Sequence, residues 1–335
     1  MKISVILPIY NQELYLDNIF DSLFSQTYDE YEIVAVNDGS TDSSRTILKK
    51  YEKDARVTVV NQENAGSLAA TATGVSVASG EYVCFVDADD IVGNNYLQNF
   101  VNELDHEYDF VAMGFSYRYG NKAVAHPLAK DRVYTKSELM ELSKNYIVDD
   151  HLHLDNKIFI ARWNKIYKRQ MLLKILDEWK NLRGICYGDD TIFTFLMLQN
   201  SQNGKAVMAV NEYQYVQHEQ SMTHTPDLTS YADRCRNVCI VYQGLLKKYR
   251  MPQGQAYLLF YALVSGVLST SVETCAVDAP RFYRELVAMP YFNDALRVVD
   301  AYCHSRNANV WMLRHSVPYW VYRTARRFKA WLHQQ

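Results

Sequence analysis

The first 90 residues alternate between short apolar runs and stretches whose apolar residues recur at helical spacing. A nearly continuous apolar run is typical of a strand that is covered on both faces. Such runs occupy residues 3–8, 31–36, 57–60 and 81–86. Three helices are expected between these strands. The first has an apolar stripe of Leu14, Ile19 and Leu23, and the second begins at the capping residues Thr41-Asp42-Ser43. The third covers residues 67–78. This alternation predicts an α/β fold with a mostly parallel sheet flanked by helices.

Polar or turn-forming residues follow each of these strands. In a parallel sheet the carboxyl ends of the strands meet at one edge, which is where ligands bind. The residues at these ends are 8–11, 37–40, 61–66 and 87–89. The sequence therefore places the active site at this edge.

The remainder of the chain divides near residue 225. Up to that point the pattern is mixed, with expected helices at 96–104, 137–146, 171–178 and 190–198 and expected strands at 110–119, 205–210 and 212–216. After Pro226 it becomes helical, with segments at 231–249, 257–271 and 280–289. We expect a catalytic domain over 1–225 and a helical C-terminal region over 226–335.

Composition narrows the class of protein. The chain has 335 residues, 48% hydrophobic and 22% charged, with a net charge of −3, so it can build a core and shows no overall nucleic-acid signature. Its six cysteines form no Cys-x-x-Cys pair, which predicts reduced thiols in a cytoplasmic protein. We expect neither a signal peptide nor a transmembrane helix, since no apolar run reaches about 18 residues.

One segment carries most of the chemical information. The apolar run Tyr82-Val83-Cys84-Phe85-Val86 ends in Asp87-Ala88-Asp89-Asp90. Carboxylates at the rim of a sheet are hard oxygen ligands, suited to a divalent cation and a phosphate-bearing substrate. Alternatively, these acids stabilise the N-terminus of a following helix and bind no metal. That explanation would account for Asp90 but not for three acids directly after a buried strand.

With its neighbours, this segment resembles family 2 glycosyltransferases of the GT-A, nucleotide-diphospho-sugar transferase fold, of the kind that builds bacterial surface polysaccharides. The similar motifs are Val5-Ile6-Leu7-Pro8-Ile9-Tyr10-Asn11, Val36-Asn37-Asp38-Gly39-Ser40-Thr41-Asp42, Asn64-Ala65-Gly66, Gly80-Glu81-Tyr82 through Asp90, Trp163-Asn164-Lys165-Ile166-Tyr167 and Gly188-Asp189-Asp190-Thr191-Ile192-Phe193. The resemblance covers roughly residues 1–224 and leaves the helical remainder uncovered.

The resemblance implies the following roles for the donor site. Asp38 would contact the base, with Pro8 and Tyr10 lining its pocket, although Asp38 also suits a turn. Asp89 would ligate Mn²⁺ or Mg²⁺ directly, with Asp87 beside the ribose and the cation. The full implied set for the nucleotide-sugar is Pro8, Tyr10, Asn11, Asp38, Gly66, Asp87, Ala88 and Lys165. Lys165 and Trp163 would support the acceptor side, unless they are an ordinary surface lysine and core tryptophan.

The resemblance also implies a catalytic base, Asp190, with Asp189 beside it. An inverting transferase needs a carboxylate to accept the proton of the attacking hydroxyl. A helix-capping pair is the alternative. Where many relatives have arginine, this chain has Val216, which puts an arginine contact to the diphosphate in doubt. His218 is a candidate replacement, as a donor or a further metal ligand, although a lone histidine is more often structural.

The C-terminal tail has an amphipathic pattern. Val321, Ala325, Phe328 and Leu332 fall on one helical face with arginines away from it, and Trp311, Trp320 and Trp331 lie nearby. This predicts peripheral contact of residues 311–332 with an anionic membrane, or packing on the chain's own domain or on a second copy in a homodimer.

Taken together, we expect a metal-dependent inverting glycosyltransferase. It would move a hexose or N-acetylhexosamine from a nucleotide-diphospho-sugar, most readily a UDP-sugar, to a saccharide hydroxyl. If the tail contacts a membrane, we expect the acceptor to be a lipid-linked saccharide at the inner face of the cell membrane. The alternatives are a sugar nucleotidyltransferase and a nucleotide-sugar-binding protein with a decayed site. A dehydrogenase is excluded because no Gly-x-Gly-x-x-Gly follows the first strand.

Overall fold

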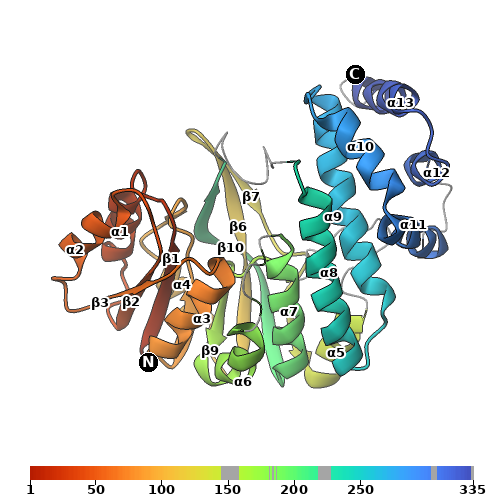
Figure 1. Cartoon of the computed structure of the whole chain (residues 1–335). Helices are drawn as coiled ribbons and strands as arrows, with labels where there is room; N and C mark the ends of the chain where they lie inside the picture. Colours follow the sequence, from red (N-terminus) through yellow and green to blue (C-terminus); the bar gives the residue numbers. More distant parts are fainter. Residues whose placement is uncertain are drawn as a thin grey trace. The chain divides into compact units, whose positions relative to one another are not determined.

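The chain forms two structural units in a computed structural model (Figure 1). The structure describes residues 1–144, 158–180, 182, 185, 187–217, 228–302 and 308–332. The first unit runs over 1–143 and 156–218, and the second over 144–155 and 219–335.

The N-terminal half of the first unit is the predicted parallel sheet. Four strands lie in the order β3-β2-β1-β4, all parallel. They are β1 (Ile3–Ile9), β2 (Tyr31–Asp38), β3 (Val57–Gln62) and β4 (Tyr82–Phe85). The connecting helices are α1 (Leu16–Phe24), α2 (Ser44–Tyr51) and α3 (Ser67–Val77). Leu14 was expected in the first helix but precedes it and is 78% exposed.

The second half of the sheet is mixed. Strand β9 (Lys165–Lys168) lies antiparallel between β4 and β6 (Phe110–Tyr119), so β6 runs in the same direction as β4. Strand β10 (Asn203–Val216) is parallel to β6. The carboxyl ends of β6 and β10 therefore point to the same edge as those of β1–β4.

The remaining strands are antiparallel additions. Strand β7 (Lys122–His126) pairs with β6, and both β5 (Ile91–Val92) and β8 (Arg132–Thr135) pair with β10. Residues 205–210 and 212–216, predicted as two strands, belong to β10. The register between β10 and β6 shifts at Val210, so the break in the apolar pattern reflects an irregular strand rather than a turn.

Helices cover both faces of the sheet. On one face, α1 and α4 (Tyr96–Glu103) pack on inward side chains that include Val111, Met113 and Phe115. On the other lie α3, α6 (Arg169–Lys180) and α7 (Asp189–Asn200), where the ring of Phe85 packs 5.8 Å from those of Trp179 and Phe193. The first unit also contains α5 (Lys136–Lys144).

The second unit is helical, as the sequence predicts. Its helices are α8 (Tyr231–Lys248), α9 (Gly254–Glu273), α10 (Ala279–Ala288), α11 (Pro290–Tyr302), α12 (Ala308–Arg314) and α13 (Tyr319–Leu332). Helix α9 contacts α8, α10, α11 and α13. By length and composition it is the one described helix that could cross a membrane, but 56% of that apolar stretch is buried in the structure. We interpret α9 as the core helix of this unit.

Tyr322 and Arg326 connect helix α13 to the rest of its unit. Tyr322 is fully buried, with its ring 5.1 Å from that of Tyr283, and Arg326 pairs with Glu273 at 3.0 Å. Val321 and Ala325 are only partly buried. Tyr322 and the stem of Arg326 thus contribute to packing beside the predicted face, and the side chains of Phe328 and Leu332 lie outside the described residues.

Candidate functional site

The loops that follow β1, β2 and β3 are joined to one another by side-chain hydrogen bonds. Oδ1 of Asn11 accepts a bond of 2.8 Å from the backbone N–H of Thr41, and the N–H of Asn11 donates to Oγ of Ser40 at 3.1 Å. Nδ2 of Asn37 donates to Oδ1 of Asn61 at 2.8 Å. The parallel strands bring these polar ends together, and the bonds fix their positions.

Asp38 organises the loop that leads into α3. One carboxylate oxygen accepts from Nε2 of Gln62 at 2.6 Å and from the N–H of Ala65 at 2.9 Å; the other accepts from the N–H of Gly66 at 2.9 Å. Its side chain is buried, at 3% exposure. Gly66 has φ of +91° and ψ of 162°, a conformation restricted to glycine. Asp38 therefore holds Gly66 at the start of α3.

Tyr10 lies directly beyond β1 and is 48% exposed. Pro8, in β1, is partly buried and pairs in register with Val36 of β2. An exposed aromatic ring beside braced polar loops is suited to stacking against a planar base. Pro8, Tyr10, Asn11, Asp38 and Gly66 therefore belong to one edge of the sheet, as predicted.

The acidic segment after β4 is attached to β10. The hydroxyl of Tyr213 donates to Oδ2 of Asp90 at 2.6 Å and accepts from the N–H of Asp87 at 3.2 Å, and the N–H of Val216 donates to Oδ1 of Asp90 at 2.8 Å. Asp90 is 3% exposed, whereas Asp87 and Asp89 are partly exposed. Asp90 thus secures the segment, and the other two acids remain accessible to a ligand.

The accessible acids sit in an excess of negative charge. Burial raises the pKa of Asp87 to about 7, the charge of Asp89 adds to the rise, and Arg162 opposes it. Two hard oxygen donors in such a field fit Mg²⁺ or Mn²⁺, which need only one or two protein carboxylates when substrate phosphates complete the shell. Among the described residues, no cluster of three or more His, Cys, Asp or Glu side chains forms a ready-made cage. His218 lies outside the described residues.

A second acidic pair begins α7. Gly188 has φ of +72° and lies at the N-cap position, and Asp189 and Asp190 occupy the first turn. A helix N-terminus stabilises carboxylates through its exposed N–H groups and its dipole. Burial nevertheless raises the pKa of Asp189 to about 6, against the opposing charge of Arg162.

Arg162 holds this pair and is the main residue that the sequence analysis missed. Its Nε lies 2.5 Å from Oδ1 of Asp190, and its Nη2 lies 3.2 Å from Oδ2 of Asp189. The same side chain donates to the hydroxyls of Ser67 at 3.0 Å and Thr71 at 3.3 Å on α3. Burial alone would lower the pKa of Arg162, but the surrounding carboxylates, Asp190 first, raise it.

Arg162 therefore links the start of α3 to the start of α7. The sequence contains one sign of the importance of Arg162, its position directly before the motif Trp163-Asn164-Lys165. The sequence alone does not show whether such an arginine is buried or exposed.

Two predicted ligand contacts are placed in the interior. Lys165 is fully buried, and its Nζ donates to the carbonyls of Phe159 at 2.8 Å and Ala161 at 2.6 Å and to Oδ1 of Asn164 at 2.6 Å. Burial lowers its pKa to about 7. The side chain of Ala88 is 2% exposed. In this structure Lys165 braces the segment that carries Arg162, and its predicted contact with the donor, like that of Ala88, stays a prediction.

Trp163 is also a core residue. It is 8% exposed, and its ring stacks on Tyr213 at 4.4 Å and on Tyr215 at 5.4 Å. It therefore supports the strand whose Tyr213 holds the acidic segment, and the alternative reading of a core tryptophan holds.

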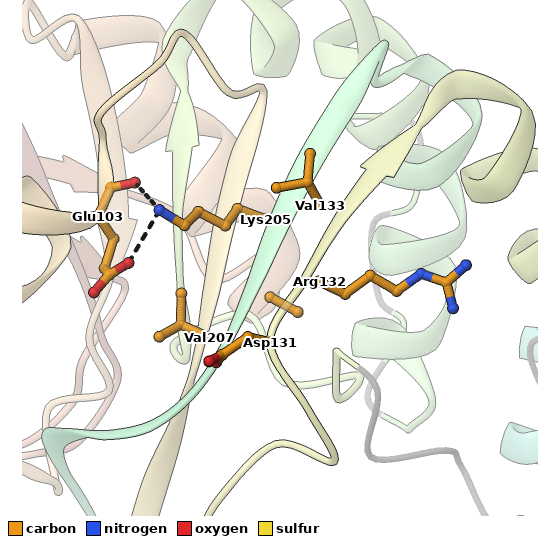
Figure 2. Close-up of a pocket in the computed structure, with 7 residues that line it drawn as sticks. Glu103, Asp131, Arg132, Val133, Lys205 and Val207 are labelled. Carbon is orange, nitrogen blue, oxygen red and sulfur yellow. Dashed lines mark hydrogen bonds and ion pairs between the residues drawn. The ribbon is translucent and has the colours of Figure 1, made fainter.

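A cavity of about 400 Å³ lies elsewhere in the first unit (Figure 2). It is lined by Glu103, Asp131, Arg132, Val133, Lys205, Ala206 and Val207. Lys205 pairs with Glu103 at 3.1 Å, and Arg132 pairs with Glu138 at 2.7 Å. Lys205 aligns with Val111 near the start of β6, far along the strand from the carboxyl edge. The cavity lacks the acids and glycine loops of that edge, so we do not assign the chemistry to it.

Comparisons with known proteins agree with this geometry. The model of the family described as glycosyl transferase family 2 matches residues 4–176. The uncharacterized glycosyltransferase EpsJ of Bacillus subtilis (strain 168) is 30% identical over 266 residues, which cover 77% of this chain and 69% of EpsJ. Glycosyltransferase GlyA of Streptococcus pneumoniae is 36% identical over 177 residues, 51% of this chain but only 25% of GlyA.

Solved structures show that the fold is shared. S. aureus TarS, residues 1–349, superposes with a TM-score of 0.62 at 20% identity, covering 100% of this chain and 92% of that one. Its complex with UDP-GlcNAc gives a TM-score of 0.65, also at 20% identity, covering 93% of that chain. The expected mostly parallel sheet with flanking helices is thereby confirmed. The family model matches residues 4–176, and EpsJ is 30% identical over 77% of this chain. The chain therefore belongs to glycosyl transferase family 2.

Proposed function

We propose that this protein is a metal-dependent, inverting glycosyltransferase that moves a hexose or N-acetylhexosamine from a UDP-sugar to a saccharide hydroxyl. The observation that carries the proposal is the pairing of Asp189 and Asp190 with Arg162, which lies within the electrostatic reach of Asp87. Braced polar loops, hard oxygen ligands and a carboxylate pair are thus available together for a nucleotide-sugar. Polysaccharide or glycoconjugate biosynthesis is the process that such a reaction serves.

In this proposal Asp190 is the base. A carboxylate at the start of a helix, held by a guanidinium, stays oriented while it accepts the proton of the acceptor hydroxyl as that oxygen attacks the anomeric carbon. Asp189, with its own contact to Arg162, takes an acceptor hydroxyl as a hydrogen-bond partner. Attack from the side opposite the leaving nucleoside diphosphate inverts the anomeric centre.

Asp87 and Asp89 would hold Mn²⁺ or Mg²⁺. When bound, the cation neutralises negative charge on the departing diphosphate. Burial is the main cause of the raised pKa of Asp87, and the nearby charges of Asp89, Asp190 and Asp189 add to it. A bound cation would offset these negative charges, which supports the assignment. Binding of UDP should depend on Mn²⁺ in the wild type, and Asp89→Ala should remove that dependence. An Asp89→Ala protein whose UDP affinity still rises with Mn²⁺ would contradict the ligand assignment.

A UDP-sugar is the proposed donor. The complex of TarS with UDP-GlcNAc, a protein of the same fold, supports this choice. The test is to incubate the full chain and Mn²⁺ with UDP-glucose, UDP-galactose, UDP-GlcNAc, UDP-GalNAc, GDP-mannose and dTDP-sugars, and to measure release of nucleoside diphosphate with and without mixed oligosaccharide acceptors. Release from a UDP-sugar alone among these donors supports the proposal. Turnover restricted to GDP- or dTDP-sugars would reject the uridine specificity.

We further propose a cytoplasmic location, with peripheral contact at the inner face of the membrane through residues 311–332 and a lipid-linked acceptor. Trp311 and Trp320 are 58% and 71% exposed, and Arg323 and Arg327 share the exposed face of α13 with Trp320. Exposed tryptophans beside arginines favour an anionic bilayer. Flotation with phosphatidylglycerol vesicles should recover the wild type but not a variant with Trp311→Ser, Trp320→Ser, Arg323→Gln and Arg327→Gln.

The homodimer is the competing explanation for the same exposed side chains. Sedimentation of both proteins without vesicles distinguishes the two. If wild type and variant float equally with vesicles, and the wild type sediments as a dimer but the variant as a monomer, this face binds a second copy of the chain.

A further inference from the structure

Arg118 lies near the carboxyl end of β6, one strand away from the acidic segment. It aligns in register with Val216 of β10, and the N–H of Val216 binds Asp90 at 2.8 Å. Neighbouring strands are spaced by about 4.8 Å, so Arg118 and the acidic segment are separated by roughly 10 Å of sheet. This distance is within reach of a substrate that carries two phosphates and a sugar.

The side chain of Arg118 is on the face of the sheet that carries the catalytic acids. Side chains alternate along a strand, and Val111, Met113 and Phe115 of β6 all point into the core beneath α1 and α4. Arg118, at the opposite phase, therefore faces the side of α7. Its Nη1 donates to Oε1 of Gln214 on the adjacent strand at 2.6 Å, which holds one of the two terminal nitrogens of the guanidinium.

Arg118 has no carboxylate partner within the part of the chain that the structure describes. Its one side-chain bond there is to the neutral amide of Gln214. In the same unit, Arg56 pairs with Asp54, Arg132 with Glu138, and Arg162 with the two acids of α7. Arg118 is also only partly buried. A guanidinium with unused donors, roughly 10 Å of sheet from the acidic segment, is available for an anionic ligand.

We infer that Arg118 binds phosphate oxygens of the substrate at the carboxyl edge of the sheet. The inference rests on the proposed transferase function. It places the positive charge at this edge on β6, because position 216 of β10, where many relatives have arginine, is valine in this chain. A guanidinium presents paired N–H donors that match two phosphate oxygens. Arg162 cannot take this role, since both acids of α7 already occupy it. The phosphate belongs to the donor diphosphate or to a phosphate in the acceptor, and the experiment below separates these sources.

The test compares Arg118→Gln and Arg118→Lys with the wild-type full chain, with Arg132→Gln as the matched control. Arg132 is an arginine of the same unit whose partner, Glu138, is partly exposed. Isothermal titration with Mn²⁺ present measures the affinity for UDP, uridine, inorganic pyrophosphate and glycerol 3-phosphate. Thermal unfolding of each variant confirms that it is folded.

We expect Arg118→Gln to weaken binding of UDP and pyrophosphate by about 10- to 100-fold, the usual loss for hydrogen bonds to a charged group, and to leave uridine unchanged. Arg118→Lys should lie between, and Arg132→Gln should match the wild type. This result places the phosphate in the donor. Unchanged UDP and pyrophosphate with weakened glycerol 3-phosphate places it in the acceptor.

Two results would overturn the inference: equal weakening of uridine and UDP, which indicates a general loss of the pocket, or no change with any phosphate probe. A wild type that binds pyrophosphate but neither uridine nor UDP would reject the proposed donor alone, because pyrophosphate still tests Arg118. A wild type that binds none of the phosphate probes would reject both.

Discussion

Nε of Arg162 lies 2.5 Å from Oδ1 of Asp190, and this contact joins the segment before β9 to the first turn of α7. Arg162 also bonds to Ser67, the first residue of α3, which follows the glycine held by Asp38. A single guanidinium thus holds α3 and the carboxylate pair of α7 in one arrangement. We regard Arg162 as a positioning residue.

Replacing Arg162 by lysine should separate this role from simple charge. Lysine keeps the positive charge but cannot contact both acids and the hydroxyls of α3 at once. We expect kcat to fall by about 10-fold, KM for the donor to change little, and the free energy of unfolding to fall by about 1–3 kcal/mol. Steady-state kinetics and urea unfolding measure these quantities.

The matched control is Arg56→Lys, which alters an arginine paired with Asp54 away from the acids of α7. Unchanged kcat in Arg162→Lys, or a rise in KM without loss of kcat, would contradict the positioning role.

Asp190→Asn should abolish transfer and leave donor binding nearly intact. The amide is almost the same size but cannot accept the proton, so kcat should fall by about 10²- to 10⁴-fold. Asp189→Asn should lose less, because its proposed part is to bind a hydroxyl. Nucleotide release assays and UDP titration provide the measurements, and near-normal turnover in Asp190→Asn would place the base elsewhere.

Gly66→Ala should damage both stability and nucleotide binding. At φ of +91° an L-residue is strained, which costs about 1–3 kcal/mol, and relief of the strain would shift the N–H that Asp38 accepts. UDP affinity should fall together with the unfolding midpoint. Gly120→Ala is the control, since Gly120 has φ of +57° with open space around its Cα. Gly120→Ala should lower the unfolding midpoint and leave UDP affinity unchanged. An equal loss of UDP affinity in both variants would contradict the proposed role of the Gly66 loop in nucleotide binding.

Acid should weaken the fold partly through Glu32. Burial opposes its ionisation, but hydrogen bonds from Lys2, Ser4 and Ser79 outweigh burial and lower its pKa to about 2. Because the folded pKa lies below the ordinary value of 4.5, this stabilisation is present above about pH 4.5 and is lost as the pH falls towards 2.

Glu32→Gln should therefore lower the free energy of unfolding by about 1–2 kcal/mol at pH 7, discounted for partial solvent contact, and flatten its decline between pH 5 and 3. Urea midpoints at pH 7, 5 and 3 test this. Glu52→Gln, an exposed glutamate after α2, should behave as the wild type. A decline as steep in Glu32→Gln as in the wild type would assign the acid sensitivity to other groups.

The arrangement of the first four strands could be predicted from sequence because the information is local. Each apolar run is followed by polar turn residues and then a helical stripe, and parallel order follows from right-handed crossovers. The positions of Asp38, Asp87 and Gly66 at one edge follow from that order alone. Residues 110–119 and 205–216 were also expected to form strands, as β6 and β10 do. Their place in the sheet could not be predicted, because β9 inserts antiparallel between β4 and β6 from more than 40 residues further along the chain.

The same division applies to the site. The sequence by itself determined which residue types stand at the strand ends and at the start of α7, since motifs and turns are read along the chain. Only the tertiary structure decided that Arg162 pairs with both acids, that Lys165 is buried on backbone carbonyls, and that Arg118 faces the acidic side. The physical reason is that burial and ion pairing depend on which segments meet across the sheet, and the identity of an arginine or lysine is the same whether its charge is solvated, paired or left for a ligand.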